Sequence, residues 1–187
     1  LEGIPNRKFF LKLQLLRLAD LEEYVFDKLE NETPESLYFH SPGYAKQMYN
    51  YAELLAKAEN LDVEETLLIR TAILLLPLGY LTNYINPELE ASRLTRELLS
   101  EFGYSGEQNQ KITNLILASK YPPEPLNHLE KVMVDIQHEY LGRVDYLDLH
   151  QLLLREKNDH AEKILPSDWR EQQIKLSQKF SYFTPGA

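Results

Sequence analysis

Apolar residues recur along this 187-residue chain at intervals of three and four positions, which is the spacing of a buried helical face. The first such pattern predicts a long helix over residues 6–30, with one stripe made by Leu11, Leu15, Leu18, Leu21 and Val25. A second helix is expected to begin at Ser41, because a serine N-cap followed by Pro42 is typical of a helix start. Its buried face would hold Ala45, Met48, Ala52 and Leu55.

Three further helix starts carry a capping-box pattern, in which an acceptor side chain is followed three residues later by Glu or Gln. The pairs are Asp62 with Glu65, Ser105 with Gln108, and Asn127 with Glu130. A helical pattern over 87–102 is expected to end at Gly103 in the left-handed conformation that glycine favours. Residues 121–125 predict an extended loop. Two helices close the chain, one around 146–154 and one over 167–181 that carries Trp169, Ile174 and Phe180.

These patterns predict an all-α fold, because no segment alternates apolar and polar residues with the period of a strand. We expect a bundle of about seven to nine helices in a single domain over residues 1–187. The most apolar stretch, residues 71–81, is about half of the roughly 20 residues that a membrane helix needs, and we interpret it as a buried helix end followed by a turn. Leu1 is not Met, so we expect the chain to be part of a longer protein.

Composition narrows the classes of partner. The net charge of −9 argues against nucleic acid and anionic membranes, since both select for basic surfaces. The chain has no Cys, which excludes disulfides, thiolate zinc sites and Cys nucleophiles. Cysteine usage of this kind is compatible with the cytoplasm, where we expect the protein to be located.

Several short motifs follow one another in a recognisable order. They are Leu37-Tyr38-Phe39-His40, Thr71-Ala72 with Gly79-Tyr80, Glu101-Phe102-Gly103-Tyr104-Ser105, and Tyr140-Leu141-Gly142-Arg143. This order resembles the HD-domain family of metal-dependent phosphohydrolases, mainly over residues 34–156 and more weakly at Phe183-Thr184. The resemblance implies an HD-like helical bundle whose helices would surround a divalent-metal site.

The residues that would bind this metal are replaced. The resemblance places the first metal-binding His at Tyr44, the His-Asp pair at Leu76 and Pro77, and the last metal-binding Asp at Gln137. Leucine and proline offer no donor atom, tyrosine would have to lose its proton from a pKa of about 10, and glutamine offers one neutral carbonyl oxygen. We therefore expect no metal, no cofactor and no catalytic residue, and predict that the chain is not an enzyme.

Other residues near the motif positions form a candidate pocket. The resemblance places His40 at the lip of the former active site, and it places Lys120 and Arg143 beside motif positions, where they would meet an anion. The remaining members are Glu88, retained after the auxiliary His position at Pro87, and Asp135, the first acid of the family's Asp triplet.

The residues alone also admit simpler roles for members of this candidate pocket. His40 would then be a core histidine hydrogen-bonded to the backbone, and Glu88 would favour the positive end of a helix dipole. Asp135 would share a solvated or salt-bridged helical face with His138 and Glu139.

Three functions stay open at this point. The first is a non-catalytic regulatory, ligand-sensing or interaction module of the signalling type, with a second copy, a fused or separate signalling domain, or a small anionic ligand as its partner. The second is a phosphohydrolase with an altered site, acting on nucleotides or phosphoesters. The third is a structural or dimerisation domain. A cavity near His40, Asp135 and Arg143 would favour ligand sensing, whereas a centre filled by side chains would favour a scaffold.

Overall fold

The computed structural model describes residues 7–161 and 163–187, with side chains described from Arg17 onward. The described residues contain no β-strand, so the all-α class is confirmed. The helices are α1 (Arg7–Glu32), α2 (Pro42–Ala58), α3 (Val63–Leu75), α4 (Leu78–Thr82), α5 (Pro87–Leu98), α6 (Gly106–Ala118), α7 (His128–Gln137), the 3-10 helix η1 (Glu139–Gly142), α8 (Tyr146–His160) and α9 (Pro166–Lys179).

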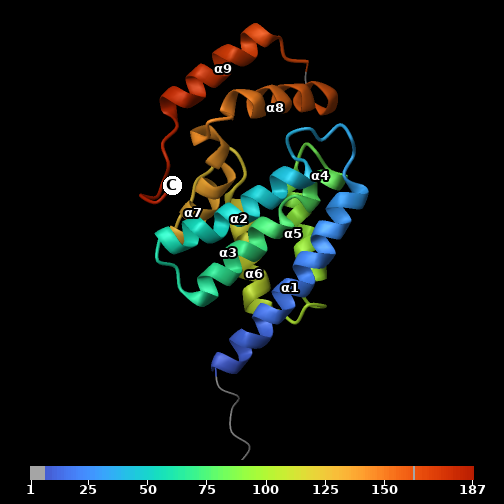
Figure 1. Cartoon of the computed structure of the whole chain (residues 1–187), viewed down its shortest axis with the longest axis vertical. Helices are drawn as coiled ribbons and strands as arrows, with labels where there is room; N and C mark the ends of the chain where they lie inside the picture. The colour runs from blue at the N-terminus through green and yellow to red at the C-terminus, as the bar shows by residue number, and fades with distance from the viewer. Residues whose placement is uncertain (1–6, 162) are drawn as a thin grey trace, which may run out of the picture.

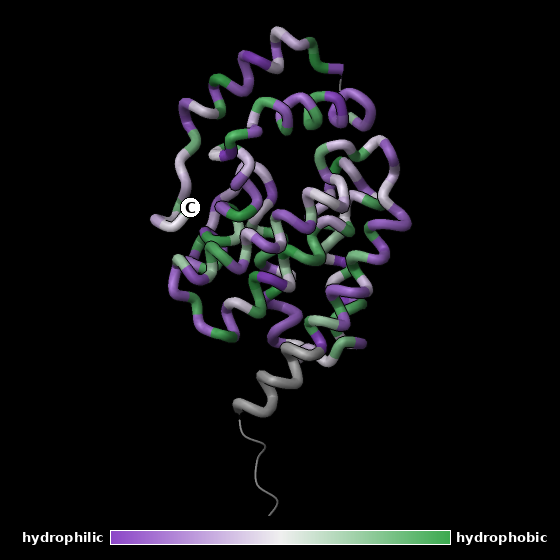
Figure 2. The backbone as a smooth tube through the Cα atoms, in the orientation of Figure 1, coloured by the Kyte–Doolittle hydropathy of each residue, from purple (hydrophilic) through white to green (hydrophobic). Residues whose placement is uncertain are grey.

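The helices form a bundle with a two-helix extension at one end (Figure 1). Helices α2 and α3 cross the middle, α1 lies along one side, and α5 and α6 pack behind them. Helices α8 and α9 lie at the top of the view, and the chain after α9 runs back down to the bundle beside α7. The hydrophobic segments gather in the centre of the bundle, where they form one core (Figure 2).

The long first helix faces the core with the stripe predicted for it. Leu18, Leu21 and Val25 are all buried, and Leu29 extends the same face. Leu11 and Leu15 lie outside the residues whose side chains the structure describes. The predicted face of α2 is also buried along its whole length.

Local capping explains where several helices begin. Ser41 accepts a hydrogen bond from the N–H of Tyr44, and Pro42 is the first residue of α2. The capping boxes at the starts of α3 and α6 are both complete, as predicted. Asn127 caps α7 as expected, but the Glu130 carboxylate accepts from the N–H of Leu126, one residue before the cap. This box is therefore only partly formed.

The apolar segment over Val63–Thr82 is long and apolar enough to cross a membrane, but 67 % of its most apolar 18-residue window is buried inside the protein. It consists of α3 and the short α4, with Pro77 between them, so the predicted turn is a further helical turn. Gly79 permits the contact of α4 with α5, because a Cβ there would lie 2.0 Å from the carbonyl oxygen of Pro87. The segment is interpreted as the centre of the core.

Other boundaries differ modestly from expectation. Helix α5 ends at Leu98, before the predicted residue 102, and Gly103 then adopts a φ of +70° in the left-handed region. Helix α8 continues to His160, well past the predicted end at 154. In α9 Trp169 is buried, whereas Ile174 is half exposed.

Candidate functional site

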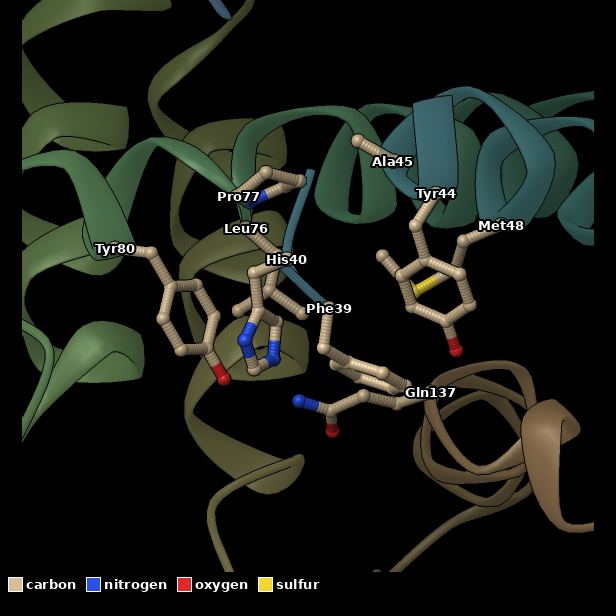
Figure 3. A pocket seen from close by; sticks show the side chains of 9 residues that line it. All are labelled: Phe39, His40, Tyr44, Ala45, Met48, Leu76, Pro77, Tyr80 and Gln137. Atoms are coloured by element: carbon tan, nitrogen blue, oxygen red, sulfur yellow. The ribbon is translucent and has the colours of Figure 1, made fainter. Parts of the chain in front are cut away.

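A small inner pocket lies where three separated segments meet. Tyr44 of α2, Leu76 and Pro77 at the α3–α4 junction, and Gln137 at the end of α7 all line it, together with His40. These are the four positions at which the resemblance places metal ligands, with the residue expected at the lip beside them. Figure 3 shows the His40 and Tyr80 rings face to face, with Leu76 and Pro77 on one side and Gln137 on the other. The cavity measures about 30 Å³, roughly the space of one water molecule.

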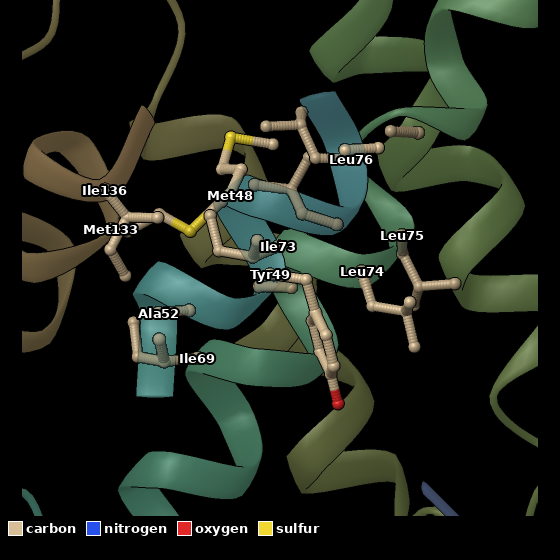
Figure 4. Packing of buried hydrophobic residues seen from close by; sticks show 14 of the residues in the cluster. Met48, Tyr49, Ala52, Ile69, Ile73, Leu74, Leu75, Leu76, Met133 and Ile136 are labelled. Atoms are coloured by element: carbon tan, nitrogen blue, oxygen red, sulfur yellow. The ribbon is translucent and has the colours of Figure 1, made fainter. Parts of the chain in front are cut away.

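The side chains of this inner pocket do not fit a divalent metal. Burial, followed by the nearby charge of Glu139, raises the pKa of Tyr44 well above its ordinary value, so its oxygen is a neutral hydroxyl. Leu76 belongs to the apolar core, where it lies beside Met48 (Figure 4). The only other donor at these positions is the neutral amide of Gln137. In the part of the chain that the structure describes, no three His, Cys, Asp or Glu side chains group as metal ligands do.

His40 is held by a buried carboxylate that no sequence motif predicts. Glu156 of α8 is fully buried, and its Oε2 accepts hydrogen bonds from the N–H groups of Phe39 at 2.8 Å and His40 at 2.9 Å. Its Oε1 pairs with Nδ1 of the His40 ring. The ring stacks on Tyr80 with a centroid separation of 3.7 Å. The imidazole is thereby fixed in position beside the pocket.

The charge of Glu156 is stabilised by these partners. Burial by itself would raise the pKa of the carboxyl group, but the hydrogen bonds and charge of His40 and the N–H of Phe39 together hold the pKa below its ordinary value. Glu156 is therefore ionised near neutral pH. A buried carboxylate of this kind persists because its acceptor oxygens are satisfied.

A much larger outer cavity of about 540 Å³ adjoins the inner pocket and lies between the bundle and helices α8 and α9. Phe39, His40, Tyr80 and Gln137 line both spaces. Its volume is within the range of about 300–1,000 Å³ that small-molecule sites occupy. The outer walls combine aromatic rings, amides and basic side chains, among them Tyr121, Tyr140, Trp169, Gln172, Gln173, Lys157, Lys175 and Lys179.

The members of the predicted candidate pocket do not all converge. His40 and Glu88 line the outer cavity, whereas Lys120, Asp135 and Arg143 line neither space. Lys120 is exposed beside the lining residue Tyr121. Neither space therefore brings Lys120 and Arg143 together, and their role as anion contacts stays a prediction.

Arg143 and Asp135 have other partners. The Arg143 guanidinium binds Asp145 with two hydrogen bonds of 2.7 Å and also contacts Gln47 and Glu139. Asp135 is fully buried and accepts hydrogen bonds from the N–H groups of Phe183 and Thr184 and from the Thr184 hydroxyl. Its carboxylate fastens the C-terminal segment to α7, so it does not face a ligand site.

The expected helical face of Asp135, His138 and Glu139 is also absent. Helix α7 ends at Gln137, and Glu139 begins η1, which points the three side chains to different partners. The His138 ring binds the carbonyl oxygen of Val134 at 2.8 Å, and Glu139 pairs with Arg143.

No family model, characterised protein or solved structure matches the chain. The function is therefore inferred from the geometry of the two adjoining spaces and from the chemistry of the residues around them.

Proposed function

We propose that the chain is a non-catalytic relative of the HD-domain phosphohydrolases that binds a small molecule in the outer cavity. The inner pocket would be the remnant of the metal site, closed by Tyr44, Leu76, Pro77 and Gln137. The outer cavity would be the ligand site, with His40 between the two.

One observation carries this proposal: four positions chosen by resemblance to one family, from segments up to 93 residues apart, line a single pocket. An incorrect register would scatter them, since shifting a helical residue by one position turns its side chain by about 100°. Their convergence supports the HD-like register, and their lack of donor atoms supports the loss of metal chemistry.

The outer cavity favours ligand binding over a purely structural role. A scaffold would be expected to have a centre filled by side chains. The inner pocket fits that expectation, because only about 30 Å³ of it is unfilled. The adjoining 540 Å³ space does not, because it is unfilled, lies among aromatic and polar side chains, and has the volume of a small-molecule site.

The His40–Glu156 pair is the observation that favours the second candidate, an enzyme with an altered site. A carboxylate that orients an imidazole is a common arrangement for a general base. Hydrolysis of p-nitrophenyl phosphate and bis(p-nitrophenyl) phosphate, with Mg²⁺, Mn²⁺ or Zn²⁺ added, tests this candidate. We expect no turnover above that of His40→Ala; turnover that disappears in this variant would establish the enzyme and overturn our proposal.

Ligand binding itself is tested with the neutral fluorescent probe N-phenyl-1-naphthylamine. We expect its emission to rise on binding to the 187-residue chain and the affinity to fall in Leu176→Trp, because the larger side chain would occupy part of the outer cavity. Leu147→Trp is the matched control, since Leu147 is exposed on α8 and lines neither space. Equal affinity in both variants, or no binding at all, would contradict a ligand site here.

The register is tested separately by restoring the ligands. The quadruple variant Tyr44→His, Leu76→His, Pro77→Asp and Gln137→Asp is expected to regain part of the metal affinity, measured by calorimetric titration with Mn²⁺. A folded variant that binds no metal would count against the HD-like placement.

A further inference from the structure

The walls of the outer cavity carry more positive than negative charge, although the chain as a whole has a net charge of −9. Lys157, Lys175 and Lys179 line it, and Glu88 is the one carboxylate among its lining residues. The Glu156 carboxylate behind His40 is already bound by His40 and two backbone N–H groups. The cavity is therefore a local basic site on an acidic protein.

Two of these lysines differ from the third in having no carboxylate partner among the described residues. Lys175 pairs with Glu171 at 2.6 Å, whereas Lys157 and Lys179 have no ion pair within residues 17–161 and 163–187. Lys157 comes from α8 and Lys179 from the last turn of α9, so the two cations approach the cavity from different helices. Ammonium groups placed in this way attract an anion into the space between the helices.

Trp169 contributes a largely buried ring to the wall of the cavity. It lines the cavity and is 3 % exposed, and it packs on His150 with a centroid separation of 5.1 Å. The ring therefore supplies a fixed apolar surface at the base of α9.

The remaining wall is largely aromatic. Phe39, Tyr80, Tyr121 and Tyr140 line the space together with the Trp169 ring. Aromatic side chains bind flat apolar groups through stacked and edge-to-face contacts. The cavity thus offers apolar surface for a ring system and separate polar groups for an acid.

From these features we propose that the ligand is a monoanionic organic acid, a carboxylate or sulfonate carried on a flat apolar body. This inference rests on the proposed ligand-binding function and specifies its chemistry. The cations are single and separated, and no Arg fork of the kind that binds phosphate bidentately lines the cavity. Glu88 further disfavours a second negative charge, so a phosphate ester is the poorer ligand.

A matched pair of probes tests the sign of the charge. 8-Anilinonaphthalene-1-sulfonate and N-phenyl-1-naphthylamine share the same ring body, and only the first carries a sulfonate. We expect Lys157→Gln and Lys179→Gln each to lower the affinity for the sulfonate probe by about two- to fivefold, the range for partly exposed ion pairs. The affinity for the neutral probe should stay within about twofold of the native value. Lys111→Gln on α6 is the control, because it removes the same charge away from the cavity.

The location of the bound probe is checked through Trp169, the single tryptophan of the chain. Because Trp169 lines the cavity, a probe bound there will quench its emission by energy transfer. Sulfonate affinity should also fall as salt is raised, since screening weakens exposed charges. Circular dichroism confirms that each variant is folded.

The outcomes separate the two proposals. If both probes bind and quench Trp169 but neither lysine variant affects the sulfonate probe, the anion inference fails and the ligand site survives. If neither probe binds, both proposals fail. Competition distinguishes the acids: 1-naphthoate should displace the sulfonate probe at lower concentration than 1-naphthyl phosphate, and the reverse order would overturn the assignment to a monoanion.

Discussion

The carboxylate of Glu156 binds His40 twice, through the ring Nδ1 and the backbone N–H, and also accepts from the N–H of Phe39. These partners lie 116 residues apart in the sequence, so the contact joins α8 to the segment that leads into α2. It fixes one wall shared by the inner pocket and the outer cavity.

Replacing this carboxylate is expected to destabilise the protein. Glu156→Gln keeps the shape but removes the charge, and we expect a loss of about 1–3 kcal/mol in the free energy of unfolding, the range for charged hydrogen bonds left poorly satisfied. Urea denaturation provides the measurement. Glu171→Gln, which removes an exposed partner of Lys175, should lose no more than about 0.5 kcal/mol. Equal losses in the two variants would show that the buried carboxylate stabilises the protein no more than an exposed ion pair does.

The same carboxylate should make stability sensitive to acid. Its pKa is lower in the folded state than the ordinary value of 4.5, so the unfolded chain binds the proton more readily. The contribution of Glu156 is therefore present above about pH 4.5 and is lost as the pH falls through the lower folded pKa. Urea denaturation measured from pH 6 to pH 3 should show that the free energy of unfolding falls less steeply in Glu156→Gln than in the native chain.

His150 should make the stability depend on pH a second time. It lies on α8 where this helix contacts Trp169 of α9. Burial lowers the pKa of this histidine, both ring nitrogens lack a partner among the described residues, and the ring lies 5.1 Å from Trp169 and 5.5 Å from Tyr146. Because the pKa is lower in the folded state than in the unfolded state, the full contribution of neutral His150 to stability is present above about pH 6.5. Stability falls as the pH decreases below that value.

The emission of Trp169, followed during denaturation between pH 7 and pH 5, measures this response. His150→Phe should reduce the pH slope, while His138, whose pKa burial also lowers, continues to contribute. An unchanged slope in His150→Phe would exclude His150 as its source.

The attachment of the C-terminal segment should depend on Asp135. Asp135→Asn replaces an acceptor of three hydrogen bonds with a weaker one, and we expect a loss of about 1–3 kcal/mol together with loss of amide-exchange protection at Phe183 and Thr184. Thr184→Val removes only the hydroxyl bond and should lose about 1 kcal/mol. Retained protection in Asp135→Asn would show that other contacts hold the segment.

The contact of α4 with α5 should tolerate no side chain at Gly79. Gly79→Ala would bring a methyl group into the backbone of Pro87, and we expect a loss of about 1–3 kcal/mol through forced movement of the helices. Gly106→Ala is the control, because a Cβ there would meet no atom within 4 Å. Thermal unfolding distinguishes them, and equal melting temperatures would contradict the close approach.

Local signals in the sequence were sufficient for most of the helices. Ser41, Asp62 and Ser105 each lie within three residues of the N–H group that they cap, so the pattern and the structure coincide. The short helix α4 was missed because Pro77 and Gly79 are typical of a turn, whereas here the buried surroundings favour a helical turn. Helix α8 extends past its predicted end, and the extension contains Glu156, whose partners lie inside the protein.

The candidate site was less accessible to sequence reasoning. The inner pocket positions followed from a resemblance, and no periodicity marks Tyr44 and Gln137 as neighbours. The Glu156 partner of His40, and the lysines of the outer cavity, depend on how α8 and α9 fold back over the bundle. No local pattern near Lys157 or Lys179 predicts that placement. No local pattern predicts that the C-terminal segment will donate hydrogen bonds to Asp135 either.

The segment that contains α8 and α9 leaves the bundle after η1 and returns beside it, since the Tyr182 hydroxyl donates to the carbonyl oxygen of His138. The segment is therefore attached to the bundle at both ends, and the outer cavity lies between it and the bundle. The space is open to solvent, so opening of either attachment, at Trp169 or at Thr184, would widen an existing entrance. Local opening of the chain would then change the shape of the ligand site as well as the stability of the C-terminal segment.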